Sequence, residues 1–340
     1  MRIVRTALGT LAAAVLVASL GAPPGPAWSG PAGQAGPGAT MLWVAASGSQ
    51  AVAWVTQEGH YFTRNGVNVN LEYISGSPTA AAALVGGRVD FVQMAGPAVV
   101  TADAHGAHLV MVMGFVTKPV FVVMATPDIK SPDQLKGKTV AVVKVGSSDD
   151  FMLREALTHW SLAPETDVKI TGVGSVAGQI AALSKHLVDA AVFDPPNDVL
   201  ASQVGAHLLA RVADLGIPYQ AAGLVTTREY IRAHPDIVAK VVRAMTEGVH
   251  RFKTDRAFAE EVMAKYLKNS DPVVVNASYD AYVDVFAQVP APSKAGLQEI
   301  AKQDLATGAL RSPIDVTPML DASFVERLAQ TGFIQRLYAK

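Results

Sequence analysis

Five short loops rich in serine, glycine and proline contain the residue types best suited to binding a small solute. Each loop precedes a segment of helical composition, so its free backbone N–H groups and the positive end of the helix dipole can hold an anion without an arginine. Glycine in such loops lets the backbone approach a ligand closely. The loops read Ser47-Gly48-Ser49-Gln50, Gly76-Ser77-Pro78-Thr79, Ala95-Gly96-Pro97, Gly146-Ser147-Ser148 and Gly174-Ser175. We expect ligand contacts from Ser47, Ser49, Gln50, Ser77, Thr79, Gly96, Pro97, Gly146, Ser147, Ser148 and Ser175.

Helix capping is the competing interpretation of the same serines. Ser77 before Pro78 and Ser131 before Pro132 have the pattern of an N-cap followed by proline at the first helical position. For Ser131 we expect capping alone. For Ser77 and Ser148, capping and ligand contact can coexist.

Asp194 is a further candidate for ligand binding. It ends an apolar run, residues 190–193, and precedes two prolines, so we expect it to face a cleft from the second half of the chain. A carboxylate there could bind an amine of the ligand, and the alternative is a cap for the following helix. Trp54, Phe193 and Tyr219 could stack on a flat ligand, although a lone aromatic residue is more often part of the core.

Other chemistry has little support in the residue pattern. The chain has no cysteine, which excludes thiol catalysis, disulfides and lipid attachment through an N-terminal cysteine. His105 and His108 lie in a Gly/Ala-rich loop without an acidic neighbour that would complete a metal site. Hydrolase, zinc-protease and P-loop motifs are missing from the sequence. We therefore expect no metal, no cofactor and no enzymatic activity.

Composition limits the class of protein further. The 340 residues are 50% hydrophobic and 17% charged, with a net charge of −1. These values are typical of a globular protein of about two domains. Lysine and arginine are scattered, so we expect no nucleic-acid partner, which would require a basic stripe.

The first forty residues have the composition of an export signal. Arg2 and Arg5 precede an apolar run over residues 7–20, and a Pro/Gly-rich stretch without acidic residues follows. The run is shorter than the roughly 20 residues that span a bilayer, so a cleaved signal peptide is favoured over an uncleaved anchor. We expect a free periplasmic protein.

The remainder alternates short apolar runs with helix-length segments, the pattern of an α/β protein with parallel or mixed sheets. After about residue 224 the pattern becomes helical. Strands are expected over residues 42–46, 67–74, 89–94, 109–115, 120–125, 139–143, 168–171 and 188–193. Helices are expected over residues 51–58, 78–85, 97–104, 149–160, 176–183, 235–252, 255–267, 272–286 and 323–330.

A repeat at an interval of 99 residues indicates two similar lobes. The matches fall at strand starts and at strand-to-helix turns, where duplication would preserve them. Ala83, Leu84, Val89, Asp90 and Pro97 recur as Ala182, Leu183, Val188, Asp189 and Pro196.

Several motifs together resemble the periplasmic solute-binding proteins of the nitrate/sulfonate/taurine ABC-importer family. They cover nearly all of the chain after the leader, and their order and spacing are specific. The motifs are Glu58 with Tyr61-Phe62, Gly66-Val67-Asn68-Val69, Gly76-Ser77, Gly87-Arg88-Val89-Asp90-Phe91, Ser131-Pro132-Asp133-Gln134-Leu135-Lys136-Gly137-Lys138, Val188-Asp189-Ala190 and Asp194-Pro195.

The resemblance implies a two-lobe periplasmic-binding-protein fold and a set of partners. Residues 41–124 and 224–340 would form lobe 1 and residues 125–223 lobe 2, with hinges near Ala125 and residues 221–226. The protein would act as a monomer that binds a small-molecule ligand and delivers it to an inner-membrane ABC permease.

The ligand class stays open at this point. A small organic anion or zwitterion, such as a sulfonate or taurine, is favoured, and a heteroaromatic vitamin precursor is the alternative. An enzyme similar to the pyrimidine-synthesising relatives with this fold is a further alternative, which the leader and the missing cysteines disfavour.

Overall fold

A computed structural model describes residues 38–339 of the protein. The predicted leader, residues 1–40, therefore lies almost entirely outside the described residues. Its last three positions belong to the first strand, β1 (Gly38–Trp43), where Ala39 is buried and the Thr40 N–H donates to Asp90 Oδ2 at 2.8 Å.

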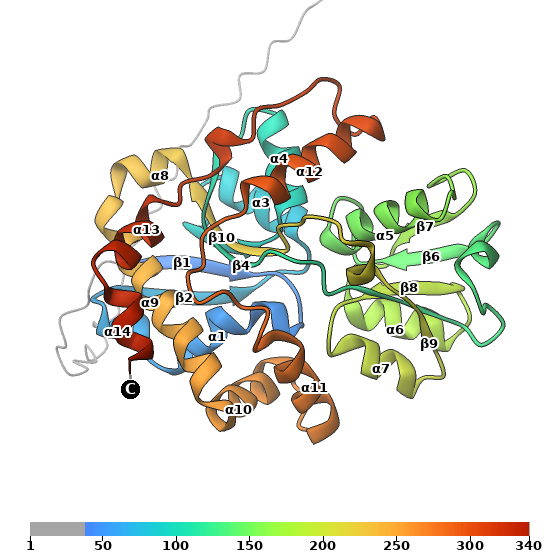
Figure 1. Ribbon diagram of the computed structural model, residues 1–340, viewed down its shortest axis with the longest axis horizontal. Coiled ribbons are helices and arrows are strands. Elements are labelled where there is room, and N and C mark those ends of the chain that lie inside the picture. Colours follow the sequence, from blue (N-terminus) through green and yellow to red (C-terminus); the bar gives the residue numbers. More distant parts are fainter. Residues whose placement is uncertain (1–37, 340) are drawn as a thin grey trace, which may run out of the picture. The chain divides into compact units, whose positions relative to one another are not determined.

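The first sheet contains five strands in the order β2-β1-β3-β10-β4 (Figure 1). Strand β1 is parallel to β2 and β3, whereas β10 is antiparallel to both of its neighbours. The bounds are β2 (Asn68–Tyr73), β3 (Phe91–Met94), β4 (Leu109–Val116) and β10 (Ala222–Thr227).

The second sheet has the corresponding order β7-β6-β8-β5-β9. Here β6 is parallel to β7 and β8, and β5 is antiparallel to both of its neighbours. The bounds are β5 (Val122–Ala125), β6 (Thr139–Val142), β7 (Lys169–Gly172), β8 (Ala190–Phe193) and β9 (His207–Arg211). The predicted α/β class with two sheets is confirmed.

The two sheets repeat the same contacts 99 residues apart. Asp90 Oδ2 accepts from the Thr40 N–H, and Asp189 Oδ2 accepts from the Thr139 N–H, both at 2.8 Å. Helices α3 (Ser77–Val85) and α6 (Val176–Ser184) also begin and end 99 residues apart. We call the first sheet with its helices lobe 1, and the second sheet with the helices of residues 148–203 lobe 2.

Two segments of chain join the sheets, residues 117–121 and residues 212–221, the latter beginning with a 3₁₀ turn, η3 (Val212–Leu215). The predicted lobe boundaries at residues 125 and 223 and the predicted hinges lie within or beside β5 and β10. A hinge is predicted near residues 221–226, whereas residues 222–226 belong to β10, a buried strand that lies between β3 and β4 of the first sheet. Gly223 allows β10 to approach β4, because a Cβ there would lie 2.4 Å from the Met113 carbonyl oxygen.

Helices pack on both sheets and make up most of the C-terminal segment. In the first two thirds of the chain they are α1 (Ala51–Glu58), α2 (Tyr61–Arg64), α4 (Gly96–Ala104), α5 (Ser148–His159) and α7 (Asn197–Gln203), with 3₁₀ turns η1 (Gly48–Gln50) and η2 (Pro132–Leu135). After β10 they are α8 (Arg228–Ala233), α9 (Pro235–Thr254), α10 (Arg256–Leu267), α11 (Pro272–Tyr282), α12 (Lys294–Ala306), η4 (Thr317–Met319), α13 (Ser323–Gln330) and α14 (Phe333–Tyr338).

Side-chain caps fix several helix starts. Thr227 caps α8 and Asp255 caps α10 by accepting a backbone N–H from the first turn. Ser131 occupies the N-cap position of η2 but makes no side-chain bond there, so the expected cap is missing. Within residues 38–339, no helix is both long enough and apolar enough to cross a membrane.

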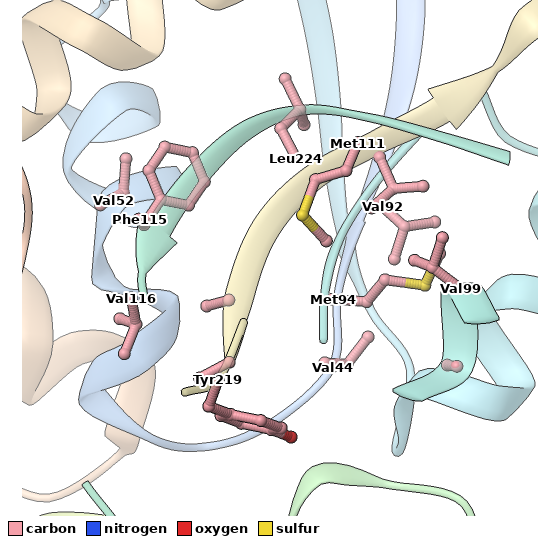
Figure 2. Close-up of a cluster of buried hydrophobic side chains, with 14 of the residues drawn as sticks. Val44, Val52, Val92, Met94, Val99, Met111, Phe115, Val116, Tyr219 and Leu224 are labelled. Atoms are coloured by element: carbon pink, nitrogen blue, oxygen red, sulfur yellow. The ribbon is translucent and has the colours of Figure 1, made fainter. Parts of the chain in front are cut away.

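The core of lobe 1 is continuous from β3 through β10 to β4 (Figure 2). Leu224 of β10, Val92 of β3 and Met111 of β4 all belong to this core, and all three are fully buried. Trp54 stacks on Tyr266 with ring centroids 5.2 Å apart, so it belongs to this core.

Candidate functional site

A cavity of about 60 Å³ is lined by residues of both sheets and their connections. Five helices of eight or more residues begin at its wall, α1, α3 and α4 from lobe 1 and α5 and α6 from lobe 2. The residues at these starts are Gln50, Ser77, Ala95, Ser148 and Val176. The positive ends of helix dipoles from both lobes thus converge on one space, which favours an anionic group.

Six of the predicted contact residues line this cavity. Ser77 is nearly fully buried, and its Oγ accepts from the Ala95 N–H at 3.4 Å, which links the starts of α3 and α4. The serine hydroxyls and the side-chain amide of Gln50 supply additional hydrogen-bond donors and acceptors at the wall of the cavity. The six are Ser49, Gln50, Ser77, Ser147, Ser148 and Asp194.

Three further predicted residues do not line the cavity and make hydrogen bonds elsewhere. Ser47 caps η1 by accepting from the Ser49 N–H, and its Oγ donates to Asp194. Ser175 caps α6 by accepting from the Gly178 N–H at 3.1 Å. Thr79 Oγ1 accepts a hydrogen bond from Lys144 Nζ of lobe 2.

The other three lie against neighbouring segments. Gly96 and Pro97 are buried, and a Cβ on Gly96 would lie 2.6 Å from Ile300 Cδ1 of α12. Gly146 has a positive φ of 81°, and its N–H donates to Asp150 Oδ2 at 2.8 Å. The helical C-terminal segment therefore covers the start of α4 that the sequence analysis assigned to the ligand.

Asp194 connects the lobes through hydroxyl groups. Its Oδ2 accepts from Ser47 Oγ, from Ser49 Oγ at 3.3 Å and from Tyr282 OH at 3.3 Å. Asn197 Nδ2 donates to Oδ1 at 3.2 Å. Burial raises the pKa of this carboxyl, and the bonds from Ser47 and Asn197 oppose that rise. The carboxylate thus lines the cavity and also holds the Ser47 loop and α11 against lobe 2.

More contacts join the lobes beside the cavity. The Gly48 N–H donates to the Pro195 carbonyl at 3.3 Å, and Ser75 Oγ donates to the Gly174 carbonyl at 2.6 Å. Gly48 is required at its position, because a Cβ would lie 2.5 Å from the ring of Tyr282. The structure therefore describes the lobes in contact around the cavity.

Asp149 and Gln179 line the cavity but were missed by the sequence analysis. Asp149 Oδ1 accepts from Ser147 Oγ, and its Oδ2 accepts from the Val143 N–H, both at 2.5 Å. Burial raises the pKa of Asp149 to about 6, and the charge of Asp150 adds to the rise. Both missed residues lie within the first turns of helices, beyond the Ser/Gly-rich loops whose composition predicted the other site residues.

The described lining residues carry two carboxylates, Asp149 and Asp194, and no lysine, arginine or histidine. An anionic ligand group would therefore depend on helix N-termini and hydroxyls, and a cationic group would be attracted by the carboxylates. Phe121 and Phe193 line the cavity, whereas Tyr219 packs on Phe151 in the core, with ring centroids 5.2 Å apart. Among the described residues, no cluster could hold a metal ion.

Residues 49–255, more than half of the chain, match the family model described as NMT1/THI5 like. The chain belongs to the NMT1/THI5-like family. No curated protein matches this family member in sequence.

Solved structures show the fold of this NMT1/THI5-like protein. The alkanesulfonate-binding protein SsuA from Xanthomonas axonopodis pv. citri, bound to MOPS, is similar with a TM-score of 0.74 at 21% identity, over 84% of this chain and 99% of that one. The periplasmic nitrate-binding protein NrtA from Synechocystis PCC 6803 is similar with a TM-score of 0.68 at 14% identity, over 87% and 89%.

A third structure carries the name of the fold. The Candida albicans CA3427 gene product, described with the generic periplasmic binding protein structural fold, gives a TM-score of 0.69 at 14% identity, over 84% of this chain and 96% of that one. The two-lobe periplasmic-binding-protein fold and the family resemblance predicted from the sequence are confirmed.

Proposed function

We propose that this chain is the extracytoplasmic solute-binding component of an ABC importer, a binding protein rather than an enzyme. The observation that carries the proposal is the cavity at which helix N-termini from both lobes converge with serine hydroxyls. SsuA is an alkanesulfonate-binding protein and NrtA is a periplasmic nitrate-binding protein, and this supports the same solute class and compartment here.

The ligand is a small organic anion or zwitterion of the sulfonate or taurine type. Its acidic group accepts hydrogen bonds from Ser77 at the start of α3 and from Ser148 at the start of α5. Because the two starts belong to different lobes, the ligand is contacted from both sides. A ligand can favour closure only through contacts that improve in the closed state, and contacts from both lobes meet that condition.

Closure would occur at the segments that join the sheets, residues 117–121 and 212–221. These are the only covalent connections between the two sheets in the described chain, so a change of lobe orientation must be taken up there. The lobes contact each other around the cavity through the Gly48–Pro195 and Ser75–Gly174 hydrogen bonds. A sulfonate therefore enters while the lobes are apart, and the lobes close around it.

A heteroaromatic vitamin precursor is the second candidate, because Phe121 and Phe193 line the cavity and offer ring surfaces. The experiment is a thermal-shift series with alkanesulfonates, aminosulfonates, nitrate and pyrimidines. A ligand at a hundred times its dissociation constant stabilises the folded protein by about 2.7 kcal/mol. Stabilisation by sulfonates or aminosulfonates supports the first proposal, and stabilisation by pyrimidines alone replaces it with the second.

A further inference from the structure

Gln179 is a fully buried side chain of the cavity wall with only one end of its amide engaged. Its Nε2 donates to the carbonyls of Ala141 and Val192, at 3.2 and 3.0 Å, and to Asp149 Oδ2 at 3.3 Å. All three neighbours are acceptors, so the reversed amide would bring oxygen against oxygen. The orientation is therefore fixed by the two strands and α5.

The other end of this amide, Oε1, has no hydrogen-bond partner among the described residues. A buried acceptor without a donor is costly, and such groups are rare in native proteins unless something outside the chain supplies the donor. Gln179 lines a cavity whose described lining residues include two carboxylates and no basic side chain. A donor that enters this cavity is therefore favoured if it is also positively charged.

We propose that Gln179 determines ligand specificity by accepting a hydrogen bond at Oε1 from an amino group of the ligand. This inference rests on the proposed function, because the amino group belongs to the solute that enters between the lobes. The acidic group of the same solute is held at the helix N-termini. The ligand is then a zwitterion, and nitrate or a plain alkanesulfonate would leave Oε1 without a donor.

The test compares 2-aminoethanesulfonate with ethanesulfonate, which share the acid and the two-carbon chain and differ only in the amino group. Isothermal titration calorimetry on the unmodified protein is expected to give at least a tenfold preference for the amino compound, the range of one charge-assisted hydrogen bond. In Gln179→Met the preference falls below about threefold, while the affinity for ethanesulfonate changes little.

Gln93 provides a matched control. It is also a fully buried glutamine, and its Nε2 donates to the Ser49 carbonyl at 2.8 Å. Its Oε1 has no hydrogen-bond partner among the described residues, as in Gln179. Unlike Gln179, it does not line the cavity. Gln93→Met loses the same groups from the other lobe. It is expected to lower stability and to keep the tenfold preference, which separates ligand recognition from general loss of packing.

The outcomes distinguish the inference from the proposed function. If both sulfonates bind with equal affinity, or if Gln179→Met weakens both equally, the inference is overturned and the binding function stands. If neither sulfonate binds, the proposed sulfonate class fails and the inference fails with it. Should Gln179→Met not fold, titration of the unmodified protein with 2-hydroxyethanesulfonate decides. This donor without charge is expected to bind more tightly than ethanesulfonate, and equal binding overturns the inference.

Discussion

Replacing Asp149 by asparagine removes a buried charge and keeps its hydrogen bonds. In the Asp149→Asn variant, the amide oxygen accepts from the Val143 N–H and from Gln179 Nε2, as Oδ2 does now. The amide nitrogen donates to Ser147 Oγ, whose hydroxyl donates to the Lys144 carbonyl. The asparagine side chain is thus a neutral equivalent of the protonated aspartate.

The expected gain follows from the raised pKa. Burial raises the pKa of Asp149 from its ordinary value near 3.8 to about 6. Between these values the folded state binds more protons than the unfolded state, so stability falls as the pH rises from about 4 to above 6. A rise of this size corresponds to about 3 kcal/mol. Asp149→Asn is therefore expected to be up to about 3 kcal/mol more stable than the unmodified protein at pH 8, with little gain at pH 4.

Urea unfolding followed by tryptophan fluorescence, at pH 4.5, 6 and 8, measures this difference. Asp315→Asn is the control of opposite sign, because hydrogen bonds from Thr317 lower the pKa of this exposed carboxyl. Asp315→Asn should show no gain in stability that increases with pH. A constant difference between Asp149→Asn and the unmodified protein across the three pH values would refute the assignment of a raised pKa to this carboxyl.

Three further substitutions test a hydrogen bond to Asp194, the packing of α9 on α1, and a partly buried carboxyl of α5. Ser47→Ala removes a hydrogen-bond donor to Asp194 and should lower the free energy of unfolding by about 1–3 kcal/mol. The loss should be larger at pH 8 than at pH 5, as measured by urea unfolding at both pH values. Gly248→Ala places a Cβ 2.0 Å from Thr56 Oγ1 between α9 and α1, so thermal unfolding should show a loss of about 1–3 kcal/mol or more. Burial, and then the carboxylates of α12, raise the pKa of Glu155 to about 7, so the stability of Glu155→Gln relative to the unmodified protein should rise between pH 4.5 and 8. If the free energies of unfolding of Glu155→Gln and of the unmodified protein change equally with pH, the prediction for Glu155 is wrong.

The repeat explains why much of the fold could be predicted from the sequence. The apolar runs and the spacing of 99 residues identified the strands that recur in both lobes, and α1 and α13 have the predicted bounds. Strand β10 was missed because its partners, β3 and β4, lie more than 100 residues earlier in the chain, and antiparallel pairing over that distance leaves no local pattern. Helix α12 was missed as well, although its apolar side covers α4.

The candidate site was predicted less completely than the fold. Loop composition identified the serines at the starts of α3 and α5, because helix starts have a local signature. It could not show that α12 covers Gly96, or that Ser47 and Tyr282 would surround Asp194, since these contacts join segments far apart in the sequence. Gln179 has a local signal, a polar residue one turn into an apolar helix, but it lies beyond the Ser/Gly-rich loops that predicted the site.

Calorimetric titration of 2-aminoethanesulfonate into three serine variants measures whether both lobes bind the ligand. Ser77→Ala and Ser148→Ala each remove one hydroxyl from opposite walls of the cavity, and Ser175→Ala removes a helix cap outside it. We expect one site per chain, with the binding free energy weakened by about 0.5–1.5 kcal/mol in each of the first two variants and unchanged in the third. Full affinity in both Ser77→Ala and Ser148→Ala would contradict binding from both lobes.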